Sequence, residues 1–395
     1  MKRYVLFVAA ALAVALGAVG GALAGSKLAQ GHEPIRPTHS TASVAVPSPA
    51  PQVADWLEVF HGDLTDPKPT HRAKPQHSAK PAHTSKPSHT ARPAHGTKPS
   101  HKPAAPHHRR AKQQPHPRHP LRGTTSSIYE RTAKPWVLAE QGCSAARRGE
   151  SGVVVLDFGK PAFKRHGYGT ILFSGRFALN HKITTAMVGY ARGYVSCLPK
   201  GSTASITLAR GTSNYHPDVP SAYTAGVRWA RATNKLGRIL RRYGWSEHVE
   251  SAAADDAEPA WDPSFRRTKQ FFHGFRAAVH GHTLYDYGSL DGGIGAVWSA
   301  KQAWYVAGGL RHTKALPEIY NSAMAQQWAE LARIAHGRYH RDVEFAGVMT
   351  QGSASCGCGF RPSAAHRELA HALDAQGIGP EALPPSGTNI VSANY

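Results

Sequence analysis

The stretch VESAAADDAEP, residues 249–259, joins a run of small and mostly apolar residues to three carboxylates and a proline. Such a run predicts a buried strand, which ends before Pro259 because proline has no N–H to donate to a ladder. Strand side chains alternate between two faces, so Asp256 and Glu258 should share one face and Asp255 should lie on the other. Two carboxylates on one face suit acid/base chemistry on a glycosidic bond. The alternative is that Asp255 or Asp256 caps a helix and that Glu258 is solvated.

Runs of the same kind recur along the chain and predict its fold class. Further strands are expected at residues 153–158, 204–209, 283–287, 315–320 and 345–349. Apolar residues between them recur at steps of three and four, which is the period of a helix. This pattern comprises Trp229, Ala232, Leu236, Leu240 and Tyr243 in one segment and Met324, Trp328, Leu331 and Ala335 in another. Buried strands that alternate with helices predict an α/β fold, with a parallel sheet and helices outside it.

The preferred architecture within this class is a (β/α) barrel of TIM type, and the alternative is an open, doubly wound parallel sheet. Six strands are visible and residues 170–174 are a weak seventh, whereas a complete barrel has eight. The domain is expected to span residues 128–378, followed by a tail at 379–395. Gly159-Lys160-Pro161, after the first strand, is not a phosphate-binding loop, so no dinucleotide or other cofactor is expected.

In either architecture the site lies where the parallel strands end. Those ends carry carboxylates suited to catalysis, amides suited to hydroxyl groups and tyrosines suited to sugar rings. The candidates for substrate binding are Asp255, Asp286, Tyr285, Tyr287, Arg210, Asn214, Tyr320, Asn321 and Gln351. The alternative is that strand ends are polar because they meet water. That explanation fits Gln351 well, but it fits Asp157 and Asp286 less well, because each follows an apolar run and precedes an aromatic residue.

On these residues the domain resembles the glycoside-hydrolase-like TIM barrels of secreted bacterial proteins, most closely the lysozyme-like family 25 group and related actinobacterial barrels. The resemblance rests on Val155-Leu156-Asp157-Phe158-Gly159 and on the spacing Asp256-Ala257-Glu258, and it covers residues 152–373. It implies that Glu258 is the general acid, that Asp256 is its partner and that Asp157 is a further catalytic residue. Asp255 and Pro259 depart from the pattern of the family. The expected function is therefore a wall-associated glycosidase, or else a non-catalytic barrel that binds or displays at the cell wall.

Four cysteines in an exported chain suggest two disulfides. In the predicted fold, Cys143 and Cys197 lie where the strands begin, whereas Cys356 and Cys358 lie in the loop after the last strand. The expected pairs are therefore Cys143–Cys197 and Cys356–Cys358. No metal site is expected, because Cys-x-Cys has no second pair at zinc-finger spacing. His366 and His371 also miss the helical spacing of a zinc pair.

Residues 1–24 predict a signal peptide. Lys2 and Arg3 precede an apolar stretch, and Ala22-Leu23-Ala24 fits a cleavage site. The apolar stretch is nearly long enough to span a bilayer, so an uncleaved anchor is the alternative. In both cases the remaining chain is expected to be extracellular and associated with the cell wall. Residues 25–67 form a linker rich in Pro, Ser and Ala, within which residues 53–64 have the apolar spacing of a short helix.

Residues 68–103 consist of six hexads of the form Lys/Arg-Pro-x-His-x-x. The segment 68–122 contains thirteen Lys and Arg, ten His and no Asp or Glu, so it holds more than half of the net charge of +22. Disorder is expected, because the hexads contain regular prolines and nothing apolar to bury. Three interpretations remain: an inert spacer, a tether that binds an anionic wall polymer more tightly as its histidines become charged, or a metal-capturing repeat. Nucleic acid is not expected, because no aromatic residue is present to stack on a base, and no stable protein partner is predicted.

Overall fold

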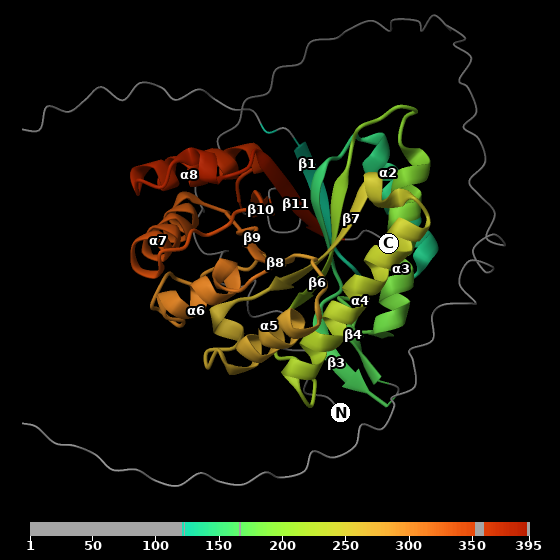
Figure 1. Ribbon diagram of the computed structural model, residues 1–395, viewed down its shortest axis with the longest axis horizontal. Coiled ribbons are helices and arrows are strands. Elements are labelled where there is room, and N and C mark those ends of the chain that lie inside the picture. Colours follow the sequence, from blue (N-terminus) through green and yellow to red (C-terminus); the bar gives the residue numbers. More distant parts are fainter. Residues whose placement is uncertain (1–120, 122, 166, 352–358, 393–395) are drawn as a thin grey trace, which may run out of the picture. The chain divides into compact units, whose positions relative to one another are not determined.

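The computed structural model describes residues 121, 123–165, 167–351 and 359–392. Within these residues the central element is a curled, parallel sheet of eight strands (Figure 1). In chain order the strands are β1 (Gly123–Tyr129), β2 (Gly152–Asp157), β6 (Ile206–Ser213), β7 (Val249–Asp256), β8 (Leu284–Asp286), β9 (Thr313–Ala315), β10 (Val348–Thr350) and β11 (Ser386–Ser392). They are ordered β10-β11-β1-β2-β6-β7-β8-β9, and every pairing is parallel. The predicted α/β class with a parallel sheet is therefore confirmed.

The two edges of this sheet are joined by backbone contacts outside the named strands. Isolated parallel bridges pair Ala315 with Phe345 and Glu318 with Met349. Hydrogen bonds accompany them, from Ile319 N to Met349 O (2.9 Å) and from Met349 N to Pro317 O (2.8 Å). The segment that follows β9 thus runs beside β10, at the opposite end of the strand order.

Helices surround the outside of the sheet in Figure 1. The α-helices of the described residues are α2 (Pro135–Arg147), α3 (Asn180–Cys197), α4 (Ala222–Arg242), α5 (Arg266–Ala278), α6 (Ala300–Trp304), α7 (Ser322–Tyr339) and α8 (Pro362–Ala375). Helix α4 begins after Ser221, whose hydroxyl accepts a hydrogen bond from Thr224 N (3.1 Å) and so caps the helix. The helical patterns expected around Trp229 and Trp328 are confirmed as α4 and α7, and both tryptophans are buried.

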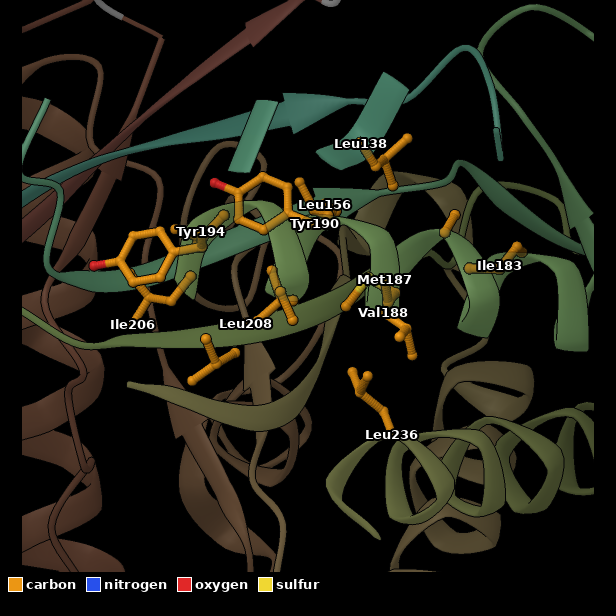
Figure 2. Close-up of a cluster of buried hydrophobic side chains, with 14 of the residues drawn as sticks. Leu138, Leu156, Ile183, Met187, Val188, Tyr190, Tyr194, Ile206, Leu208 and Leu236 are labelled. Carbon is orange, nitrogen blue, oxygen red and sulfur yellow. The ribbon is translucent and has the colours of Figure 1, made fainter. Parts of the chain in front are cut away.

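Both faces of the sheet are buried, which explains why its strands read as nearly continuous apolar runs. The outer face carries Leu156 and Leu208, which pack with Leu138, Met187 and Leu236 of helices α2, α3 and α4 (Figure 2). The inner face is lined by a separate cluster of buried residues: Val153, Val155, Ala209, Ala252, Ala254, Tyr285, Tyr287, Leu316, Met349 and Ile390. Burying one leucine side chain in such a layer contributes about 1.5–3 kcal/mol. Successive side chains of a strand alternate between these two faces. The parity of a residue, its odd or even place along the strand, therefore decides whether its side chain meets the helices or the interior of the curled sheet.

Two strands of the sheet were not predicted, because their buried side chains are polar. Strands β1 and β11 lie side by side, and the hydroxyls of Ser127 and Thr388 are 2.9 Å apart and buried. Ser127 Oγ also accepts a hydrogen bond from Val155 N (2.8 Å), while Thr388 Oγ1 donates to Thr125 O (3.2 Å). Hydroxyl groups satisfied in this way are tolerated in a core but give no apolar signal. The sheet therefore extends beyond residues 128–378 and includes β11, in the segment expected to be a tail.

The expected seventh strand at residues 170–174 is not part of the parallel sheet. It overlaps β4 (Gly167–Ile171), which pairs antiparallel with β3 (Lys160–Lys164) and β5 (Phe177–Leu179) in a separate three-stranded sheet. This sheet is inserted between the end of β2 and the start of α3. Its alternating residues gave a strand signal, but the short turns that link its strands allow only antiparallel pairing.

The predicted disulfide between Cys143 and Cys197 is confirmed. It joins α2 to the last residue of α3, with a Cα–Cα distance of 5.0 Å. The two cysteines are 54 residues apart, so the bond restricts the unfolded chain by about 4 kcal/mol in the loop-entropy account. Cys356 and Cys358 lie outside the described residues, and so does their expected pairing.

The expectations for the N-terminal third concern residues that the structure does not describe. They are the signal peptide (1–24), the linker with its short helix at 53–64, and the hexad segment 68–122 apart from Leu121. In the part of the chain that is described, none of the helices combines the length and the apolar character that a bilayer-spanning helix needs.

Candidate active site

Three carboxylates converge where the strands of the parallel sheet end. Asp256 is the last residue of β7, Glu258 follows it by two residues, and Glu318 follows β9 by three. One carboxylate oxygen from each of the three lies within 4.8 Å of the others. Asp256 and Glu318 are buried, whereas Glu258 is partly exposed. Glu258 is therefore the member of this acidic triad, Asp256, Glu258 and Glu318, that a molecule from solvent can reach most directly.

Burial keeps protons on the acidic triad, because a charged carboxylate is poorly solvated there. Desolvation, followed by the charge of Asp291, raises the pKa of Glu258 to about 7, against hydrogen bonds from the hydroxyl and N–H of Ser289. Desolvation, followed by the charge of Glu258, raises the pKa of Glu318 to about 8. The pKa of Asp256 is also raised, first by burial and then by the charges of Glu318 and Glu258. At neutral pH the acidic triad therefore holds protons that can be donated.

Asp157 belongs to the same electrostatic group. It ends β2, is fully buried, and its Oδ1 accepts a hydrogen bond from Gly159 N (2.7 Å). Desolvation raises its pKa to about 6, although the hydrogen bond from Gly159 N opposes that shift. Its charge in turn raises the pKa of Asp256 and of Glu318. Space for Asp157 comes from Gly211 on β6, where a Cβ atom would lie 2.8 Å from the Cα of Asp157.

Tyrosine hydroxyls and one amide surround these carboxylates. Tyr320 forms a hydrogen bond with Glu318 that lowers the pKa of that carboxyl, and Tyr287 donates to Thr212 O (3.2 Å). Gln351 donates through Nε2 to the hydroxyl of Tyr129. Burial, followed by the charges of Glu318 and Asp256, raises the pKa of Tyr129 well above its ordinary value. The structure thus places Tyr287, Tyr320 and Gln351, three of the candidates from the sequence, next to the acidic group.

Asp255 and Asp286 lie on the opposite face of the sheet from Asp256. Ala253 and Leu284, which precede them by two residues, pack in the cluster formed with helices α4 and α5. Asp255 and Asp286 are paired in register on β7 and β8, and both are buried. Burial, followed by the charge of Asp286, raises the pKa of Asp255. Alternation along β7 therefore separates Asp255 from Asp256, and neither Asp255 nor Asp286 lines the inner face where a substrate would bind.

Three further candidates are occupied by structural contacts. Arg210 lies on the outer face, where its guanidinium stacks 4.0 Å from the centre of the Trp229 ring and donates to the side chain of Asn180 (2.8 Å). Asn321 caps α7, accepting a hydrogen bond from Met324 N (3.0 Å). Tyr285 is on the inner face, but its pKa responds to Glu250 and Thr207. Those two residues lie near the starts of β7 and β6, so the Tyr285 hydroxyl points away from the acidic triad.

Glu318 and Tyr129 are residues of the candidate site that the sequence analysis did not select. Glu318 lies in the predicted strand at 315–320, two residues before Tyr320, so alternation from the candidate Tyr320 would have found it. Tyr129 ends β1, a strand whose polar sequence gave no signal. Pairs of aromatic rings add to the rim of the site. Tyr129 packs against the exposed Phe173 (4.7 Å between ring centres), and Tyr215 packs against Trp261 (5.4 Å).

The acidic triad could also hold a metal ion. Three carboxylate oxygens within 4.8 Å of one another are the kind of donor set that hard divalent cations use. Buried carboxylates favour any positive charge that compensates them, whether it is a proton or a cation. The raised pKa values reflect this preference for a proton.

No protein-family model matches this chain, and neither does any curated protein sequence.

Proposed function

We propose that the described domain is a complete (β/α) barrel of TIM type. The order of its eight strands follows the chain from β1 to β9, and β10 and β11 lead back to β1. The bridges from Ala315 to Phe345 and from Glu318 to Met349 support closure between β9 and β10. In such a barrel the strand ends form a single mouth, where active sites lie.

We further propose that the protein is a glycoside-hydrolase-like enzyme that acts on a cell-wall glycan. The observation that carries this proposal is the convergence of Asp256, Glu258 and Glu318, with raised pKa values, where the strands end. Glycosidases need one protonated carboxyl beside a second carboxylate that stabilises positive charge on the sugar. A short distance between carboxylates favours retention of configuration over inversion.

The roles in this mechanism follow from exposure and proton affinity. Glu258 is partly exposed and has a pKa of about 7, so near neutral pH it can donate its proton to the glycosidic oxygen. Asp157, with a pKa of about 6, ionises first and supplies negative charge behind the reacting sugar. Asp256 and Glu318 share the remaining protons and stabilise the charge that Glu258 acquires. Trp261 follows Glu258 by three residues and packs against Tyr215, and the two rings offer faces on which a sugar can stack.

The setting of this activity is inferred from the N-terminal sequence. The signal-like segment at residues 1–24 favours export, and the basic hexads favour attachment to an anionic wall polymer. The competing function is a non-catalytic barrel that binds glycan at the wall. A second competitor, a cation-binding barrel, is favoured by the oxygen spacing in the acidic triad.

The test is incubation of the full-length protein with labelled peptidoglycan, beside Glu258→Gln. Glu330→Gln, which changes an exposed glutamate of α7, is the matched control. Release of soluble fragments by the wild type and by Glu330→Gln, with a loss on the order of 10²–10⁴-fold for Glu258→Gln, supports the hydrolase. Binding without release supports the non-catalytic barrel. Activity that disappears on treatment with a chelator and returns with Mg²⁺ or Ca²⁺ supports the cation-dependent alternative.

A further inference from the structure

Glu258 lies just beyond the point where its strand stops being held by neighbouring strands. β7 ends at Asp256, and the last backbone hydrogen bond on its β6 side runs from Asn214 N to Asp256 O (3.1 Å). Pro259 follows directly and has no N–H of its own. The C=O of Glu258 accepts a hydrogen bond from Trp261 N (3.2 Å), whereas its N–H would lack a partner unless a side chain supplied one.

The side chain of Asn214 supplies that partner and also bonds to the C=O. Glu258 N donates to Asn214 Oδ1 (3.0 Å), and Asn214 Nδ2 donates to Glu258 O (2.9 Å). The amide of Asn214 thus takes the place of one more peptide unit of β6 and continues the ladder past the end of the strand. Only one orientation of the amide satisfies both contacts, because one needs an acceptor and the other a donor.

Asn214 is itself held by a buried chain of hydrogen bonds. Its second amide proton goes to Thr268 Oγ1 (3.0 Å), near the start of α5. Thr268 donates to Asp262 Oδ2 through both its hydroxyl (3.0 Å) and its N–H (2.9 Å). Trp298 Nε1 donates to Asp262 O (2.8 Å). The amide protons of Asn214 are therefore used within the protein and are not free for a sugar hydroxyl.

We propose that Asn214 is a positioning residue that fixes the backbone of Glu258 and thereby aims its carboxyl at Asp256 and Glu318; this inference rests on the proposed function of Glu258 as the acid. The hydrogen bonds from Asn214 to Glu258 go to its backbone N–H and C=O, so Asn214 acts through the peptide units of Glu258. Without it, Glu258 would lose its hydrogen bonds on the β6 side and keep those from Trp261 N to its C=O and from Ser289 to its carboxyl, so its backbone could shift away from Asp256 and Glu318. A displacement of this kind near a reacting group can cost on the order of 10²-fold in rate.

The chain contains a matched control for this clamp. Asn234 on α4 accepts a hydrogen bond from His280 N (2.9 Å) and donates to Ala278 O (2.8 Å), so it bridges two backbone groups as Asn214 does. The two asparagines are equally buried, at 5% exposure for Asn214 and 4% for Asn234. Asn234, however, holds the end of α5, just before the chain enters the start of β8. Asn214→Ala and Asn234→Ala should therefore both lose stability, whereas only Asn214→Ala should affect Glu258.

The experiment compares Asn214→Ala and Asn234→Ala in the full-length protein. Two readouts are followed: the pH dependence of kcat/KM on soluble peptidoglycan fragments, and the titration of the Glu258 carboxyl by ¹³C NMR, assigned with Glu258→Gln. For Asn214→Ala we expect kcat to fall at least tenfold and the Glu258 titration to move to lower pH, whereas Asn234→Ala should leave both unchanged. Thr268→Val keeps the shape of the side chain but removes its hydroxyl, and it should lower kcat and move the Glu258 titration to lower pH, as Asn214→Ala should. It replaces Asn214→Ala in the comparison if that variant does not fold.

The outcomes separate this inference from the proposed function. If the wild type hydrolyses nothing, the enzyme proposal fails, and the NMR titration still decides whether Asn214 positions Glu258. If Asn214→Ala and Asn234→Ala have the same Glu258 titration and the same kcat, Asn214 is only a structural residue and the inference is overturned.

Discussion

Replacing Asp157 by asparagine should stabilise the protein above pH 6 while removing a charge that the proposed mechanism uses. Asp157 is fully buried, and desolvation raises its pKa from 3.8 to about 6. The unfolded chain therefore releases this proton near pH 4, whereas the folded protein keeps it until about pH 6. Because the unfolded state ionises first, the stability of the wild type falls as pH rises through this window.

The size of the effect follows from the change in proton affinity. One pKa unit corresponds to about 1.4 kcal/mol, so a pKa raised from 3.8 to about 6 lowers stability by about 3 kcal/mol once the pH is above 6. Asparagine has nearly the same shape, does not ionise, and retains an oxygen that can accept from Gly159 N. The variant and the wild type should thus differ by an amount that grows by about 2.4 kcal/mol between pH 4 and pH 7.

The assay is urea unfolding of both proteins, with the disulfide intact, followed by tryptophan fluorescence at several pH values between 4 and 8. Asp374→Asn, at an exposed position of α8, is the control for exchanging an aspartate for asparagine away from the buried site. A difference for Asp157→Asn that stays constant within about 0.5 kcal/mol across this range would refute the reasoning, since burial would then not be what shifts the carboxyl. A variant that becomes relatively less stable at high pH would also refute it.

Three further predictions follow from the same structure and sequence. The rate of glycan hydrolysis should be bell-shaped in pH, because Asp157 must ionise (pKa about 6) and Glu258 must stay protonated (pKa about 7); a rate that still rises above pH 8 would contradict these roles. Replacing Cys143 and Cys197 together by alanine should lower the free energy of unfolding by about 4 kcal/mol in urea titrations, and an unchanged midpoint would count against the loop-entropy account. A peptide of residues 68–122 should bind purified cell wall more weakly at 1 M than at 0.1 M salt and more tightly at pH 5.5 than at pH 7.5; binding that ignores both variables would reduce the segment to a spacer.

The parts of the fold that the sequence predicted are those in which burial leaves an apolar signal. β2 contains the apolar run 153–156 and β7 the apolar run 252–254, because one face of each strand meets helices and the other meets the interior of the sheet. β1 and β11 share that environment but fill it with hydroxyls such as those of Ser127 and Thr388, which satisfy one another. Such pairs become visible only when the two strands, more than 250 residues apart, are known to be neighbours.

The candidate site was predictable wherever residue parity along one strand could be applied. Parity along β7 placed Asp256 and Asp255 on opposite faces, and the structure agrees. The same rule, applied to β6 from the inner-face residue Ala209, assigns Arg210 to the outer face, where it stacks on Trp229. Parity from Tyr320 assigns Glu318 to the same face, but the approach of Glu318 to Glu258 depends on how the sheet curls. That curvature is a property of the whole sheet and cannot be read from any single segment.

Groups that lower stability gather where the strands of the sheet end, whereas the disulfide lies near the strand starts. Asp157 alone lowers stability by about 3 kcal/mol at neutral pH, and Glu258 and Glu318 carry raised pKa values beside it. The Cys143–Cys197 disulfide lies near the strand starts, because α3 ends at Cys197 and leads into β6, and it contributes about 4 kcal/mol. One disulfide therefore offsets roughly one such carboxyl, and the apolar layers must offset the others. A structural role would be better served by amides or apolar groups at these positions, so the presence of several buried acids at one end supports the proposed function, which needs their protons.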